Sequence, residues 1–134
     1  MLDIEDTFVT DGSAPIELLI VDGNADLAES VQLLLQMHGW VVHVALDGAA
    51  ATAIIEHRPI ALAFIAIGLP DVDGYTLARR LRAAARPCAL IALTGYGHAE
   101  DRRRALDAGF DDHVLKPASL AQLEAIVTRY VRSP

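Results

Sequence analysis

The sequence predicts a single α/β domain in which helices cover both faces of a parallel sheet. Short apolar runs that end at turn-forming residues recur five times, which is typical of buried strands. Each run is followed by a segment with helical periodicity, so strands and helices alternate along the chain. A length of 134 residues suits one domain with a sizeable core.

The elements follow one another in a regular order. Strands are predicted at residues 18–21, 40–45, 60–67, 88–93 and 113–115, and helices at residues 25–38, 48–58, 75–85, 99–108 and from residue 119 onwards. Asn24 and Asp47 are suited to cap the first two helices, and Ser119 with Gln122 forms a capping box before the last. Right-handed crossovers then give a doubly wound (βα)5 sheet of flavodoxin-like strand order 2-1-3-4-5.

The chain divides into a leader and a domain. Residues 1–15 mix acidic and small polar residues without periodicity, which predicts a flexible leader before a domain at residues 16–134. The apolar runs are far shorter than the ~20 residues that a membrane helix needs. No secretory signal begins the chain. These features predict a soluble, cytoplasmic protein that does not bind a membrane.

The charge of the chain bears on its partners, and its single cysteine bears on its cellular compartment. The chain has 11 basic and 18 acidic residues, a formal net charge of −7, which argues against nucleic acid as a direct partner. Cys88 has no second cysteine to pair with, which suits a reducing compartment, and it begins an apolar run. We therefore expect Cys88 to be a buried core thiol.

Four segments near the predicted strand ends carry a resemblance to a known family. Chemistry in a doubly wound sheet gathers at the carboxyl ends of its strands. The segments at residues 18–22, 68–74, 93–94 and 116–117 follow one another at the spacings of the response-regulator receiver (CheY-like) family. The resemblance covers residues 16–131. In that family, three carboxylates hold Mg²⁺, one of them belongs to the phosphate-accepting aspartate, and a hydroxyl and a lysine bind the phosphoryl group.

Matched residue by residue, this chain resembles a degenerate receiver, or pseudo-receiver. Two of the three carboxylate positions lack an acid, so the resemblance implies no phosphate acceptor, and Mg²⁺ binding weak or absent. No other cofactor, metal or enzymatic activity is expected. The matched positions are Asp22 and Gly23 for the paired acids, Ala66 for the acceptor, Thr94 for the hydroxyl, Lys116 for the lysine and His113 for the switch aromatic.

Three further expectations concern charged residues near this site. With two acids missing, Lys116 and Asp22 are free to pair directly. Asp71 and Asp73 lie in the loop after the third strand, where turn and cap roles are expected for them rather than phosphate acceptance. Arg79, Arg80 and Arg82 are expected to form a solvated helix face.

A candidate interaction face is predicted at the fourth helix and the loop before it: Tyr96 lies in the loop, and Arg102, Arg103 and Arg104 lie on the helix. A solvated face with local ion pairing is the simpler interpretation of its arginines. Receivers often use the region from the fourth to the fifth helix to contact partners, so the resemblance also favours a role in binding.

The sequence therefore predicts a phosphorylation-independent receiver domain of two-component signal transduction or a phosphorelay. It would bind a protein partner, namely a histidine kinase, an output domain or another receiver. One alternative is a small-ligand sensor of the cyclic-dinucleotide type, which would use the arginines and Tyr96. A second alternative is a normal receiver in which Ala66 is an engineered acceptor-site substitution.

Overall fold

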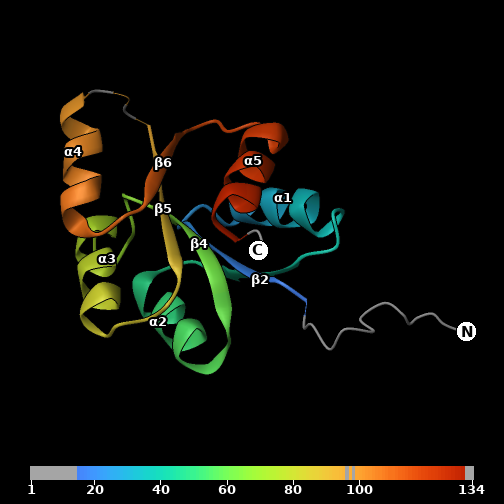
Figure 1. Ribbon diagram of the computed structural model, residues 1–134, viewed down its shortest axis with the longest axis horizontal. Coiled ribbons are helices and arrows are strands. Elements are labelled where there is room, and N and C mark those ends of the chain that lie inside the picture. Colours follow the sequence, from blue (N-terminus) through green and yellow to red (C-terminus); the bar gives the residue numbers. More distant parts are fainter. Residues whose placement is uncertain (1–14, 96, 98, 132–134) are drawn as a thin grey trace, which may run out of the picture.

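The computed structural model describes residues 15–95, 97 and 99–131, and shows alternating strands and helices (Figure 1). The predicted leader lies outside these residues except for Pro15. The elements are β2 (Glu17–Val21), α1 (Ala25–Gln36), β3 (Val41–Ala45), α2 (Gly48–His57), β4 (Ile60–Ala66), α3 (Gly74–Ala83), β5 (Ala89–Thr94), α4 (Ala99–Ala108), β6 (Asp112–Leu115) and α5 (Leu120–Val131).

The strands form one parallel sheet in the order β3-β2-β4-β5-β6. Numbered along the chain, this is the predicted order 2-1-3-4-5. The central strands β2, β4 and β5 are short, largely apolar and buried, as parallel strands are when helices cover both faces, whereas the edge strands β3 and β6 are partly exposed. The expected doubly wound fold is therefore confirmed.

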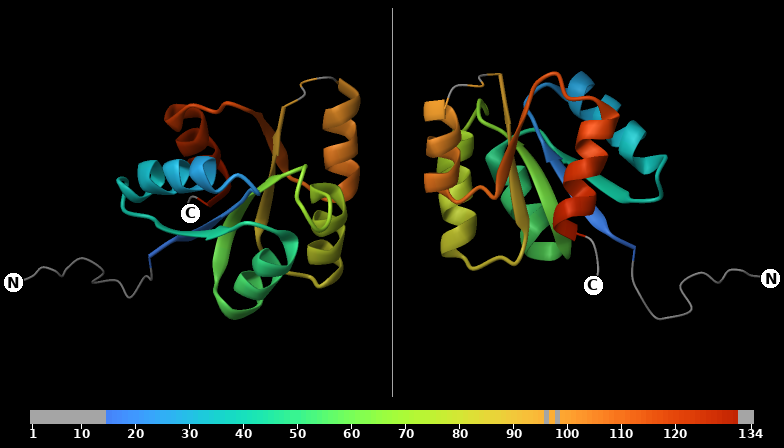
Figure 2. Two further views of the ribbon diagram at one scale, coloured as in Figure 1. Left: turned by 180° about the vertical axis from the view of Figure 1, so that it is seen from behind. Right: turned by 45° about the horizontal axis from the view of Figure 1, so that its top comes forward.

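The helices form two layers. Helices α1 and α5 cover one face of the sheet, and α2, α3 and α4 cover the other (Figures 1 and 2). Side chains alternate along β2, so Leu18 and Ile20 pack toward α1 and α5, whereas Leu19 and Val21 pack toward the other three helices. Phe64 on β4 is fully buried on the α1 and α5 side.

The predicted helix caps are present. The side chains of Asn24 and Asp47 accept hydrogen bonds from backbone N–H groups in the first turns of α1 and α2, at 3.1 and 2.8 Å. Ser119 and Gln122 exchange side chain to backbone bonds at 2.9 and 3.1 Å, which is the reciprocal pairing of a capping box. Helix α3 ends before Ala85, whose φ of 56° is incompatible with a continuing right-handed helix.

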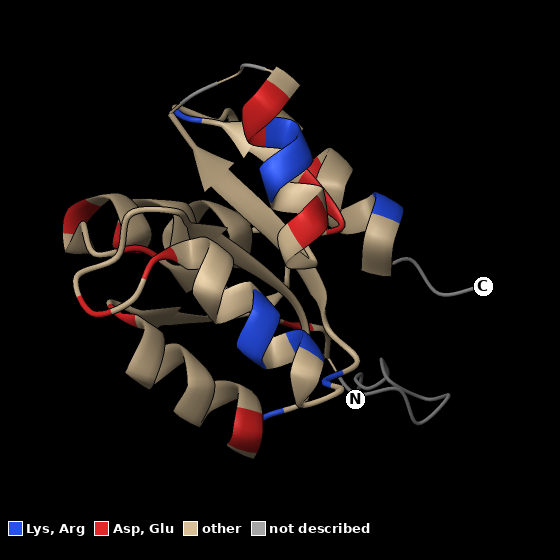
Figure 3. Ribbon diagram, turned by 90° about the vertical axis from the view of Figure 1, so that its left-hand side faces the viewer, with Lys and Arg blue, Asp and Glu red and all other residues tan. Residues whose placement is uncertain are grey.

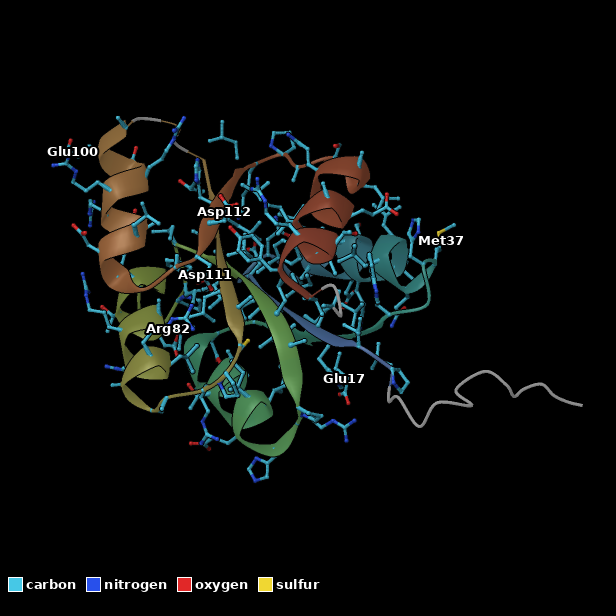
Figure 4. The ribbon with its side chains drawn as sticks, viewed as in Figure 1. Glu17, Met37, Arg82, Glu100, Asp111 and Asp112 are labelled. Carbon is cyan, nitrogen blue, oxygen red and sulfur yellow. The ribbon has the colours of Figure 1, made fainter. Side chains whose placement is uncertain are left out.

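One prediction on α3 was wrong. Arg82 does not belong to a solvated helix face, because its guanidinium is hydrogen-bonded to a neighbouring segment of the same chain, near Asp111 (Figure 4). It donates to the carbonyls of Gly109 and Cys88 at 2.7 and 2.8 Å and to Asp111 Oδ2 at 2.6 Å. Five N–H donors in a rigid fork allow one arginine to bridge several acceptors. Arg82 therefore joins α3 to the start of β5 and to the loop before β6 through hydrogen bonds.

The sequence analysis predicted no membrane-spanning segment, because every apolar run is short. Among the residues described, no helix combines the length and the apolar character needed to cross a bilayer.

Candidate functional site at the carboxyl ends of the strands

The sheet brings the predicted site residues to one edge. Ala66 ends β4 and lies beside Leu93 of β5 in the sheet register, and Thr94 is the last residue of β5. Lys116 follows β6, and its backbone N–H donates to the carbonyl of Thr94 at 2.8 Å. Asp22 follows β2 on the other side of β4. The strand ends thus place these four residues around a single region.

Asp22 and Lys116 form a direct ion pair, as expected. Lys116 Nζ lies 2.6 Å from Asp22 Oδ2, and the side chains are 30% and 6% exposed. The other oxygen, Oδ1, accepts a hydrogen bond from the backbone N–H of Asn24 at 3.0 Å. A carboxylate so deeply buried needs such partners, because burying an unpaired charge is costly. Lys116 is therefore the electrostatic partner of Asp22.

The position matched to the phosphate acceptor is a buried alanine, and the backbone at Gly74 passes close to it. Ala66 is 1% exposed. Its carbonyl oxygen lies only 2.5 Å from where a Cβ on Gly74 would be, so glycine is needed at the start of α3. Gly23 leaves more room, since a Cβ there would lie 3.3 Å from Pro70 Cδ. A side chain at Gly23 therefore requires Pro70 to move by a few tenths of an ångström.

The two acids of the loop after β4 accept hydrogen bonds from backbone N–H groups at the starts of helices. Asp71 reaches across to α2 and accepts bonds from the N–H groups of Gly48 and Ala49 at 2.8 and 3.0 Å. These bonds lower the pKa of the Asp71 carboxyl below its usual value, and the bond from Gly48 has the largest effect. Asp73 caps its own helix by accepting from the N–H of Thr76 at 2.8 Å. The expected turn and cap roles are confirmed for both.

The residues present do not fit the Mg²⁺ site that the family resemblance implies. A tight site wants several fixed oxygen ligands, and here Asp22 is the one acid among the matched positions. One of its oxygens already binds an ammonium group. Across residues 15–95, 97 and 99–131, no three His, Cys, Asp or Glu side chains gather to hold a metal. Weak or absent Mg²⁺ binding remains a prediction for titration to test.

His113, which the resemblance matches to the switch aromatic, lies on the edge strand β6. Its side chain is 24% exposed, and its backbone N–H donates to Asp112 Oδ1 at 2.8 Å. The other oxygen of Asp112 accepts from the Tyr130 hydroxyl at 2.9 Å and lies 3.3 Å from the Arg129 guanidinium. Asp112 therefore ties the edge strand to α5.

The candidate interaction face is partly described. Tyr96 lies outside the described residues. Arg102, Arg103 and Arg104 are exposed on α4, after an acidic first turn (Figure 3). Arg104 stacks over the ring of Tyr75, with its guanidinium carbon 4.5 Å from the ring centroid. This contact could not be predicted from local patterns, since Tyr75 and Arg104 belong to different helices.

Cys88 is a buried thiol, as predicted. It is 5% exposed, and burial raises its pKa to about 12. Thiolate, the reactive form, is therefore scarce at neutral pH. Cys88 is part of the core rather than of the candidate site.

Comparison with known proteins agrees with this geometry. Residues 18–128 match the family described as "Response regulator receiver domain". An uncharacterised 14.6 kDa protein of Leptolyngbya boryana is 32% identical over 119 residues, which cover 87% of this chain and 91% of that protein. The transcriptional regulatory protein TrcR of Mycobacterium tuberculosis is 38% identical over 115 residues, which cover 86% of this chain but only 44% of TrcR. The chain thus spans about half the length of the transcriptional regulators it matches.

Solved structures give the same result. A putative response regulator from Chloroflexus aurantiacus is similar with a TM-score of 0.82 and 29% identity, over 90% of this chain and all of that one. The Ssk1 receiver domain of Saccharomyces cerevisiae, solved with the histidine phosphotransfer protein Ypd1, has a TM-score of 0.80 and 26% identity, over 87% and 88% of the two chains. The fold, the strand-end geometry and these matches together place the chain in the response regulator receiver domain family.

Proposed function

We propose that this receiver domain acts without phosphorylation at Ala66, as a cytoplasmic, non-enzymatic module of a two-component system or phosphorelay that works through contact with other proteins. The observation that carries the proposal is the chemistry of the strand ends. The position matched to the acceptor has only a methyl side chain, which offers no atom to a phosphoryl group.

The ion pair supports the same proposal. In a phosphorylated receiver, the lysine after the fifth strand binds the phosphoryl group. In this chain, Lys116 Nζ contacts Asp22 Oδ2 at 2.6 Å. Because this pair needs no phosphate, the strand ends keep an internal charge balance in the unmodified chain. Without an acceptor at residue 66 to trigger a switch, the domain is proposed to keep its surfaces in one arrangement.

The surface formed by α4, β6 and α5 is the proposed contact region. Leu106 on α4 is 61% exposed and Leu115 on β6 is 45% exposed, which is high for large apolar side chains. Arg102 and Arg103 add exposed positive charge to α4. Apolar contact surrounded by charge suits a partner protein with an acidic rim. The Ssk1 receiver was solved bound to a partner protein, and we extend that kind of partner, a kinase or phosphotransfer protein, to this chain.

Phosphorylation in solution tests the proposal directly. The chain is incubated with acetyl phosphate and Mg²⁺, and its intact mass is measured. We expect no added phosphate. The matched control is the double variant Gly23→Asp with Ala66→Asp, which restores both acids and should gain acid-labile phosphate. Stoichiometric labelling of the parent chain would overturn the proposal.

The single variant Ala66→Asp separates a natural loss from an engineered one. If Ala66 replaced a native aspartate in a working receiver, this one change would restore labelling. We expect little labelling, because Gly23 still leaves the metal site one acid short. The cyclic-dinucleotide alternative stays a prediction: Tyr96 lies outside the described residues, and Arg104 already stacks on Tyr75.

A further inference from the structure

A cavity of about 300 Å³ lies between the sheet and the two helices α1 and α5, next to the strand ends. The sheet provides its floor and the two helices provide its walls, with the segment that joins β6 to α5 at one end. Most of the lining is apolar: Ile20, Leu27, Ala28, Val31, Phe64 and Leu123. The small side chains of Ala28 and Ala118 leave space where longer ones would pack.

One end of the cavity is polar. Asp22 and Lys116 both line it, and they are the two members of the buried ion pair. Lys116 has three N–H donors on its ammonium group, one of which is directed to Asp22. Asp22 accepts two hydrogen bonds and has lone pairs for more. The cavity thus combines an apolar body with one donor and one acceptor, a common composition for small-molecule sites.

The ion pair restricts the charge of a ligand. An anion drawn to Lys116 would meet the carboxylate of Asp22, whose oxygen is 2.6 Å from Nζ. A cation drawn to Asp22 would meet the ammonium in the same way. A neutral group that both donates and accepts, such as an amide or a hydroxyl, can bond to both without disturbing the pair.

The volume restricts the size of a ligand. An apolar cavity of about 150 Å³ is enough to bind benzene. At about 300 Å³, this cavity has room for one or two rings. We propose that it binds a small, uncharged and largely apolar molecule that carries one amide or hydroxyl group. The inference is independent of the missing acceptor, since Ala66 is not among the lining residues.

Nuclear magnetic resonance titration of the full chain tests this site. The probes are three neutral molecules (benzamide, phenol and benzyl alcohol) and two charged relatives of benzamide, benzoate and benzylamine. We expect at least one neutral probe to shift amide signals of α1 and α5 with a dissociation constant near or below about 1 mM, and both charged relatives to bind about fivefold or more weakly than benzamide. Failure of all three neutral probes at about 10 mM, or equal binding of benzoate, would overturn the proposal.

Two filling variants and a control locate the binding. Ala118→Leu and Val31→Phe each enlarge a lining side chain and should weaken binding by about tenfold or more. Ala125→Leu makes the same change as the first on an exposed position of α5 that does not line the cavity, and should bind as the parent does. If the folded filling variants bind as tightly as Ala125→Leu, the site lies elsewhere and the proposal fails.

Discussion

Replacing Lys116 by methionine removes the ammonium group that lies 2.6 Å from Asp22 Oδ2 and leaves a carboxylate that is 6% exposed. Two unit charges at that separation attract by about 1.6 kcal/mol in water and about 6 kcal/mol at an effective dielectric constant of about 20. Desolvation of both groups and the entropy of holding a lysine offset part of this. Because Lys116 is 30% exposed, we expect a net coupling energy of about 1–2 kcal/mol.

A double-mutant cycle measures that coupling. Lys116→Met, Asp22→Asn and the double variant are unfolded in urea. Their free energies of unfolding are compared with that of the parent, provided that the dependence on urea concentration (the m-value) is the same for all. Lys116→Met alone should cost about 2–3 kcal/mol, because it leaves a buried charge without its partner. Arg103→Met, which removes an exposed cation from α4, is the control and should stay within about 0.5 kcal/mol of the parent. If Lys116→Met unfolds at the parent's urea midpoint, the electrostatic argument is wrong.

Two substitutions and one labelling experiment test other parts of the structure. Asp71→Ala should lower the melting temperature at pH 7, and the difference from the parent should shrink as the pH falls below about 3.8 toward the lowered folded pKa, since a carboxyl of depressed pKa stabilises only while ionised. Glu17→Gln should cost about 1–3 kcal/mol in urea unfolding, because its side chain, 10% exposed, bonds to His43 and Arg58; no change would contradict a structural role. Cys88 should resist a thiol reagent at pH 8 until urea unfolds the chain, and fast labelling of the native state would show that it is not buried.

The strands, helices and caps follow from local patterns in the sequence. An apolar run such as residues 18–21 favours burial on both faces and so predicts a central strand, whereas the strand order follows from the right-handed crossovers of a doubly wound sheet. Asn24 and Asp47 bond within their own helices, and so the chain nearby holds all the information needed to predict them.

Contacts between distant segments could not be predicted in the same way. Asp71 caps α2, which lies 22 and 23 residues earlier in the chain, and Arg82 reaches Gly109, 27 residues later. Periodicity placed Arg82 on a polar face and gave no sign of these acceptors. The cavity beside Lys116 was also missed, since it depends on how α1 and α5 lie against the sheet. Sequence patterns report the neighbours along the chain, whereas these features arise from packing.

The retained lysine illustrates how the family resemblance and the structure have to be combined. Matched to its family, Lys116 is a phosphate ligand, and its presence would suggest that phosphate chemistry survives. In this chain the same ammonium group neutralises Asp22 and lines a cavity with no need of phosphate. The presence of Lys116 is therefore compatible with the ion pair alone as well as with phosphate binding. Stability measurements on Lys116 report the ion pair, labelling at residue 66 reports the acceptor, and the two can succeed or fail independently.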